Sequence, residues 1–184
     1  MNTGVVSKRF AKALLLYSFQ QGKEEKVYEE VKNLAHSYHM VPKLRKAVDN
    51  PVLEEEKKLA LLKEAAGGDG VSDELMRFFR LVLDGKRESF LQFIAWSFID
   101  QYRAKKNIRV GKLVTAVESP KLVEELEKMI GKDTGSNVEL TTEVDPSIIG
   151  GFVMELSGYR MDASVTNQLQ RLKSEFIARN RRIV

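Results

Sequence analysis

The sequence predicts an α+β fold that is mostly helical. It consists of an N-terminal six-helix bundle over residues 1–106 and a small C-terminal α/β domain over residues 107–184 that ends in a long helix. Apolar residues recur at helical spacing in six successive segments of the first part. Near Asn107 the pattern changes to alternation, the period of a half-buried strand. We therefore place the domain boundary between residues 106 and 107.

The first three helices follow from apolar spacing. The first is expected over residues 5–21, and Gly22 is a suitable stop. The second is expected over residues 24–39, with its glutamates, Glu30 among them, mostly on the outer face. Pro42 permits a short third helix, because proline is tolerated in the first turn.

Caps and breakers define the next three helices. Asn50 is expected to cap the fourth helix, with Pro51 at its first helical position. Residues 67–70, which read Gly-Gly-Asp-Gly, interrupt the chain. Ser72 then caps a strongly apolar fifth helix that ends at Gly85, and the sixth and longest helix follows.

The second domain alternates strands and helices. A strand is expected over residues 108–114, and Ser119 and Pro120 start a helix that Gly131 ends. Residues 137–144 alternate apolar and polar side chains, which predicts a second strand.

The stretch from residue 143 to residue 172 predicts a turn, a hairpin and a capped helix. Proline presets the turn, a glycine pair kinks the backbone, and Ser157-Gly158 is typical of a two-residue hairpin turn. A hydroxyl then stands where the last helix needs an N-cap. The residues that carry this motif are Asp145, Pro146, Gly150, Gly151, Asp162 and Ser164.

No pattern predicts catalysis, a cofactor or a bound metal, so we expect a non-enzyme. His36 and His39 lack a third histidine or any cysteine to complete a site. The glycine-rich loop at 67–70 lacks the Lys-Ser/Thr of a phosphate loop. Asp162 and Ser164 have no histidine in their domain, so capping explains them better than a hydrolytic triad.

The charge distribution and hydropathy of the sequence limit the classes of partner to expect. Residues 1–106 hold 19 Lys and Arg against 15 Asp and Glu, and residues 107–184 hold 11 against 11. This mild excess is spread among acids rather than clustered, so no nucleic-acid partner is expected. No run approaches the roughly 18 apolar residues of a membrane span, so any membrane association is expected to be indirect.

The turn, hairpin and capped helix at residues 143–172 resemble the C-terminal signature of the delta subunit of rotary ATP synthases, called the oligomycin-sensitivity-conferring protein in mitochondria. That signature is a Val-Asp-Pro-Ser-x-x-Gly-Gly turn, a hairpin and an Asp-x-Ser-Val helix start. This chain differs at Ala163, where the family often has glycine, and at Asn167, near which it often has a basic residue. Residues 9–14, Arg-Phe-Ala-Lys-Ala-Leu, are similar to the family's N-terminal motif, and Arg87 fits its pattern before the sixth helix.

The first and fifth helices carry more apolar surface than one buried face needs. The plain interpretation is that all of it is core, and the alternative is a groove for a partner helix. The resemblance implies such a groove, which takes the N-terminal helix of an alpha subunit. Its candidate residues here are Phe10, Leu14, Tyr17, Phe78, Phe79 and Val82.

The last helix is the candidate stalk surface, through Leu169, Leu172, Phe176 and Arg179. The plain interpretation is that its apolar side packs on the hairpin and that its basic end, which includes Arg181 and Arg182, is merely solvated.

The resemblance implies a non-catalytic peripheral-stalk subunit of a bacterial F-type ATP synthase, without cofactors. It would bind the alpha subunit through residues 1–106 and the C-terminal end of the b subunit through residues 107–184. It would sit peripherally on the cytoplasmic face of the inner membrane, resisting rotor torque. The alternative is a small helical RNA-binding module of the antitermination type, whose binding would depend steeply on salt.

Overall fold

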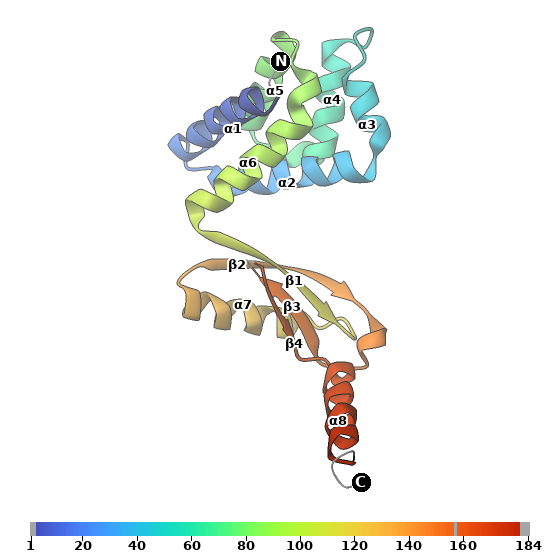
Figure 1. Ribbon diagram of the computed structural model, residues 1–184. Helices are drawn as coiled ribbons and strands as arrows, with labels where there is room; N and C mark the ends of the chain where they lie inside the picture. The colour runs from blue at the N-terminus through green and yellow to red at the C-terminus, as the bar shows by residue number, and fades with distance from the viewer. Residues whose placement is uncertain (1–2, 157, 181–184) are drawn as a thin grey trace. The chain divides into compact units, whose positions relative to one another are not determined.

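The computed structural model describes residues 3–156 and 158–180 of the 184-residue chain. Over these residues the chain is mostly helical with one four-stranded sheet, which confirms the predicted α+β class. It divides into two compact units, residues 1–105 and residues 106–184 (Figure 1).

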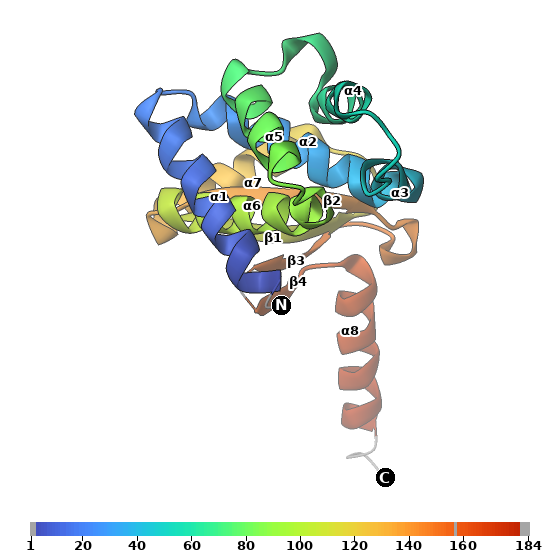
Figure 2. The same cartoon turned by 90° about the horizontal axis from the view of Figure 1, so that it is seen from above.

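Six α-helices dominate the first unit over its described residues. Helix α1 packs against α2 and α5, and α4 packs against α2, α3 and α5. Figure 2 shows α1 and α5 side by side. The helices are α1 (Thr3–Gln20), α2 (Glu24–Met40), α3 (Pro42–Val48), α4 (Glu55–Ala66), α5 (Asp73–Asp84) and α6 (Leu91–Lys106), with short 3-10 turns η1 (Gly68–Gly70) and η2 (Glu88–Phe90).

Large side chains from the helices form the core of this unit. Leu62 of α4, Phe79 of α5 and Phe98 of α6 are completely buried. Tyr102 of α6 stacks on Tyr28 of α2 with ring centroids 4.1 Å apart. Burial of each such side chain contributes about 1.5–3 kcal/mol, so these contacts hold the helices together.

The fourth helix begins later than predicted. Asn50 does not cap it: its side-chain oxygen accepts a hydrogen bond from the Val52 amide at 3.0 Å, and this makes a turn. Helix α4 therefore starts at Glu55, beyond Pro51. The predicted limits of α5 are confirmed, since Ser72 accepts a hydrogen bond from the Leu75 amide and Gly85 follows the last turn.

A buried ion pair links α4 to η2. Lys58 Nζ lies 2.7 Å from Glu88 Oε1, and the two side chains are 5% and 17% exposed. The other carboxylate oxygen of Glu88 is buried and has no hydrogen-bond partner among the described residues. Burial raises the pKa of Glu88, but the hydrogen bond from Lys58 and a backbone hydrogen bond outweigh it and leave the pKa below its ordinary value.

The second unit is built on a sheet with strand order β2-β1-β3-β4. Strand β1 pairs in parallel with β2 and antiparallel with β3, and β3 pairs antiparallel with β4. Helix α7 makes the crossover that a parallel pair requires and packs against β2. The elements are β1 (Ile108–Thr115), α7 (Pro120–Thr134), β2 (Asn137–Val144), the 3-10 turn η3 (Pro146–Ile148), β3 (Phe152–Leu156), β4 (Tyr159–Asp162) and α8 (Val165–Asn180).

The end of α7 also differs from the prediction. Gly131 is accommodated within the helix, which continues to Thr134. Gly135 follows with φ 62°, the left-handed conformation that glycine adopts without steric cost. Two glycines four residues apart both fit a helix end in the sequence, and the second of them is used.

Candidate functional site

An apolar groove lies between α1 and α5 in the first unit. It has a volume of about 410 Å³ and is open to solvent. The α1 side chains recur at i, i+4 and i+7, which places them on one face of the helix. The residues that line the groove are Arg9, Phe10, Ala13, Leu14 and Tyr17 of α1 with Arg77, Phe78 and Leu81 of α5.

Phe10 makes two ring contacts at the groove, one with Phe78 and one with Arg87. Its ring meets that of Phe78 edge-on, with centroids 6.4 Å apart and an interplanar angle of 69°. The guanidinium of Arg87 lies over the Phe10 ring at 5.3 Å from its centroid, a cation–π arrangement. Phe10 and Phe78 are half-buried, while Leu14 is buried and Leu81 is 57% exposed. Apolar surface is therefore left open between the two helices.

Two of the predicted groove residues do not line it. Phe79 and Val82 are completely buried in the core of the first unit. The physical reason is the helical rotation of about 100° per residue, which turns Phe79 inward where Phe78 faces the groove. The other four predicted residues, Phe10, Leu14, Tyr17 and Phe78, do lie together along it.

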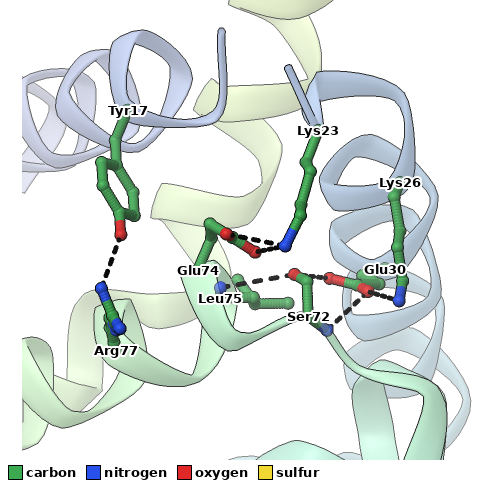
Figure 3. Close-up of polar contacts among 8 residues, drawn as sticks. All are labelled: Tyr17, Lys23, Lys26, Glu30, Ser72, Glu74, Leu75 and Arg77. Atoms are coloured by element: carbon green, nitrogen blue, oxygen red, sulfur yellow. Dashed lines mark hydrogen bonds and ion pairs between the residues drawn. The ribbon is translucent and has the colours of Figure 1, made fainter. Parts of the chain in front are cut away.

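A buried carboxylate fixes the N-terminal end of α5, as Figure 3 shows. Glu30 of α2 accepts hydrogen bonds from the Ser72 amide at 2.7 Å and from the Ser72 hydroxyl at 2.5 Å. Lys26 Nζ lies 3.9 Å from the same carboxylate. A carboxylate at a helix N-terminus is favoured by the helix dipole and by the free amides there. Glu30 was predicted to lie mostly on the outer face, and that prediction is wrong: the side chain is buried where it accepts the bonds from Ser72.

A second contact ties the α1–α2 connection to α5. Lys23 Nζ donates to both oxygens of Glu74, at 2.9 and 3.2 Å. The hydrogen bond lowers the pKa of Glu74 and raises the pKa of Lys23. Arg77, one turn further along α5, donates to the Tyr17 hydroxyl of α1 at 3.3 Å (Figure 3). Polar contacts thus set the position of α5 against α1 at this end of the groove.

Sequence reasoning missed Arg9, Ala13, Arg77 and Leu81. Leu81 follows Phe78 by three residues, which is the spacing of one helix face and was a usable signal. The arginines gave no such signal, because charged residues on a helix surface are ordinarily solvated.

In the second unit, the motif residues form a backbone clasp before α8. Asp145 accepts a hydrogen bond from the Ser147 amide at 2.9 Å, as predicted for the turn. Gly151 has φ 74°, and an added Cβ would collide with the Ala163 carbonyl oxygen. Close approach to the segment before α8 therefore requires glycine at this position. The hairpin residue Ser157 lies outside the described residues.

The helix cap at Ser164 is confirmed. Its hydroxyl accepts a hydrogen bond from the Asn167 amide at 3.2 Å. Asp162 in turn accepts from the Ser164 hydroxyl at 2.6 Å and from its amide at 3.0 Å, and these bonds lower the pKa of Asp162. The Gly150 carbonyl accepts from the Val165 amide at 3.0 Å. These bonds fix the direction in which α8 leaves the sheet.

Beyond its first turn, helix α8 has exposed side chains over its described residues. It projects from the sheet in Figure 1 and touches η3 through its first turn, where Thr166 donates to the Ser147 carbonyl at 3.1 Å. Leu169, Leu172 and Phe176 are 53%, 51% and 65% exposed, and Arg179 is exposed as well. The apolar side of α8 does not pack on the hairpin, and Arg181 and Arg182 lie outside the described residues.

The described residues contain no group of three or more His, Cys, Asp or Glu that could hold a metal ion. None of the helices among these residues has both the length and the hydropathy of a membrane span. The two exposed apolar surfaces are suited to binding other proteins.

Comparison with known proteins gives these surfaces a context. Residues 6–176 match the family described as ATP synthase delta (OSCP) subunit. The ATP synthase subunit delta of Phocaeicola vulgatus is 51% identical over 185 residues and covers both chains completely. That of Bacteroides fragilis is 45% identical, again over the whole of both chains. That of Prochlorococcus marinus is 32% identical, over 91% of this chain and 93% of the relative.

The fold is also similar to a solved structure. A chain in the mitochondrial ATP synthase hexamer of Toxoplasma gondii aligns with a TM-score of 0.59 at 21% identity. The alignment covers 93% of this chain and 97% of that one, so it supports the fold over almost the whole length. Nothing in these comparisons favours the RNA-binding alternative. By its sequence along nearly the entire length, this chain belongs to the ATP synthase delta (OSCP) subunit family.

Proposed function

We propose that this non-catalytic subunit is the stator connector of a bacterial F-type ATP synthase, joining the catalytic head to the peripheral stalk. Family membership makes it a component of the ATP synthase. The observation that supports the connector role is the presence of one exposed apolar surface on each of two separate units. A connector needs two interfaces and no chemistry.

In this proposal, residues 1–106 form one six-helix bundle that binds the N-terminal helix of an alpha subunit in the α1/α5 groove. Helix α1 has 18 residues and is roughly 27 Å long at 1.5 Å per residue, so it can flank several turns of a partner helix. Phe10, Leu14, Tyr17 and Phe78 provide the apolar contact, which is the usual mode of helix-in-groove recognition.

Residues 107–184 bind the C-terminal end of the b subunit through α8 in the same proposal. Leu169, Leu172 and Phe176 recur at i, i+3 and i+7, so they form one apolar stripe on the helix. Their exposure is large for side chains of this kind, and a stable complex would remove it from water. Arg179 extends the stripe with a positive charge near the helix C-terminus, where the dipole favours a cation.

The mechanism follows from carrying load between the two partners. Proton flow turns the rotor, and the catalytic head would turn with it unless it were anchored. The connector would supply the counter-torque at the cytoplasmic face of the inner membrane, bound peripherally through its protein partners. Its two interfaces must therefore persist through many rotor steps, which apolar burial of standard interface size, roughly 1,200–2,000 Å², can achieve.

Calorimetric titration of the full-length chain with each partner fragment tests the proposal. Phe10→Asp is expected to weaken binding of the alpha-subunit peptide and to leave binding of the b-subunit fragment unchanged. Leu16→Asp is the matched control on the same helix, because Leu16 is 48% exposed and does not line the groove.

The complementary variant is Leu172→Asp, with Gln170→Asp as its control on α8. It is expected to weaken binding of the b-subunit fragment alone. If either unit bound both fragments, or if Phe10→Asp and Leu16→Asp behaved alike, the assignment of one partner to each unit would be wrong. Circular dichroism spectra establish that each variant is folded.

A further inference from the structure

The charge on the rim of the α1/α5 groove is of one sign. The charged residues that line the groove are Arg9 and Arg77, and no acidic residue lines it. Helix α1, which forms one wall, contains Lys8, Arg9 and Lys12 and has no Asp or Glu. The groove is therefore apolar along its length with cations at its edge.

These two guanidinium groups have donors to spare. Arg77 is exposed and uses one N–H on the Tyr17 hydroxyl. Two acidic residues lie about one turn before it: Glu74, which is held by Lys23, and Asp73, which has no ion pair with Arg77. Among the described residues, neither Arg9 nor Arg77 has a carboxylate within ion-pair distance. A guanidinium has five N–H donors, so both residues can accept a carboxylate from outside the chain.

A helix laid into the groove would partly remove these arginines from water. An uncompensated cation at an interface loses hydration without gaining a partner, which opposes binding. A carboxylate beside the apolar face of the incoming helix instead makes a charge-assisted hydrogen bond, and it also selects against helices that carry cations there.

We infer that Arg9 and Arg77 are specificity-determining residues of the groove, and that its occupant is an amphipathic helix with carboxylates along the edges of its apolar face. The inference rests on the proposed role of the groove as the alpha-subunit site and adds the chemistry by which that site recognises its helix. Apolar contact supplies most of the affinity, while the arginines select the partner and its direction in the groove.

The test uses the full-length chain and two synthetic peptides. One is the N-terminal helix of the alpha subunit from the same organism, and the other is the same peptide with every Asp and Glu replaced by Asn and Gln. Each is titrated by calorimetry into the wild type, Arg77→Gln, Arg9→Gln and Arg80→Gln. Arg80 is the matched control, because it is an exposed arginine of α5 that does not line the groove.

The native peptide is expected to bind Arg77→Gln and Arg9→Gln roughly threefold to tenfold more weakly than the wild type, and to bind Arg80→Gln equally well. High salt is expected to reduce this difference, because it screens charges near the surface. The neutral peptide is expected to bind the wild type and Arg77→Gln with the same, weaker affinity.

Two results would overturn the inference. If the native peptide bound all four proteins with one affinity at low salt, the groove would still be the alpha-subunit site but the arginines would not select its occupant. If the native peptide did not bind the wild type at all, the proposed role of the groove would fail, and the inference with it. A circular dichroism spectrum of each variant shows that a loss of affinity is not a loss of fold.

Discussion

Replacing Lys58 by methionine should destabilise the first unit more than any exposed charge change. Methionine preserves most of the side-chain volume but removes the ammonium group that lies 2.7 Å from Glu88 Oε1. The second carboxylate oxygen of Glu88 already has no partner among the described residues. Lys58→Met therefore leaves a largely buried carboxylate with its backbone hydrogen bond but without its ion-pair partner.

The expected cost is about 3–5 kcal/mol, the range for breaking a buried ion pair from one side. With a urea m-value of about 2 kcal/mol per M, the unfolding midpoint should fall by about 1.5–2.5 M. Lys57→Met is the matched control, because Lys57 pairs with Glu54 at 3.0 Å where both side chains are more than half exposed. Its cost should stay below about 1 kcal/mol.

The assay is urea unfolding followed by tryptophan fluorescence. Trp96 is the chain's single tryptophan and lies in α6, so its emission reports on the first unit. The double variant Lys58→Met/Glu88→Met should recover most of the lost stability, because an apolar pair leaves no buried charge. If Lys58→Met lowered the midpoint no further than Lys57→Met, the buried pair would contribute no more to stability than an exposed pair does.

Three further predictions use the same structure. The folded-state pKa of Glu88 lies below its ordinary value, so the contribution of this carboxylate to stability is complete above the ordinary pKa and is lost as the pH falls through the folded pKa. Urea midpoints measured from neutral pH to about pH 3 should show this loss. A midpoint that did not change with pH would contradict it. Gly151→Ala should speed hydrogen exchange of the α8 amides, because the added Cβ would collide with the Ala163 carbonyl oxygen. Gly158→Ala is the control: it has φ 86° but no atom near an added Cβ, so it should cost only about 1–2 kcal/mol of backbone strain and leave α8 exchange unchanged. Equal exchange rates in the two variants would exclude the collision. Ser72→Ala should cost about 1–3 kcal/mol in the fluorescence assay, because it removes a helix cap and a hydrogen bond to buried Glu30, and a neutral result would show that water replaces the hydroxyl.

Most of the fold follows from local patterns in the sequence. Ser72, Gly85 and Ser164 lie where helix-end chemistry predicts them, because a cap depends on neighbours within three or four residues. The misplaced ends arose where two local solutions compete. Asn50 can cap a helix or close a turn, and in the structure it closes a turn. Gly131 can end a helix or be carried within it, and in the structure the helix continues past it.

The candidate site was predictable in outline but not in detail. Helical spacing located the groove on the correct pair of helices through Phe10 and Phe78. It could not tell that Phe79 faces the core, because adjacent aromatic residues look equivalent until the rotation of the helix is known. It also could not find the Glu30–Ser72 cap, whose partners are 42 residues apart.

The bare length of α8 bears on how such a complex would come apart. From residue 168 onward every described side chain of the helix is exposed, so tertiary packing adds little to its stability there. An isolated helix of 16 residues is only marginally stable in water. The helical conformation of α8 would therefore be stabilised mainly by a bound partner. Release would begin as fraying from the free end toward the Ser164 cap, so the joint should yield gradually under load instead of snapping.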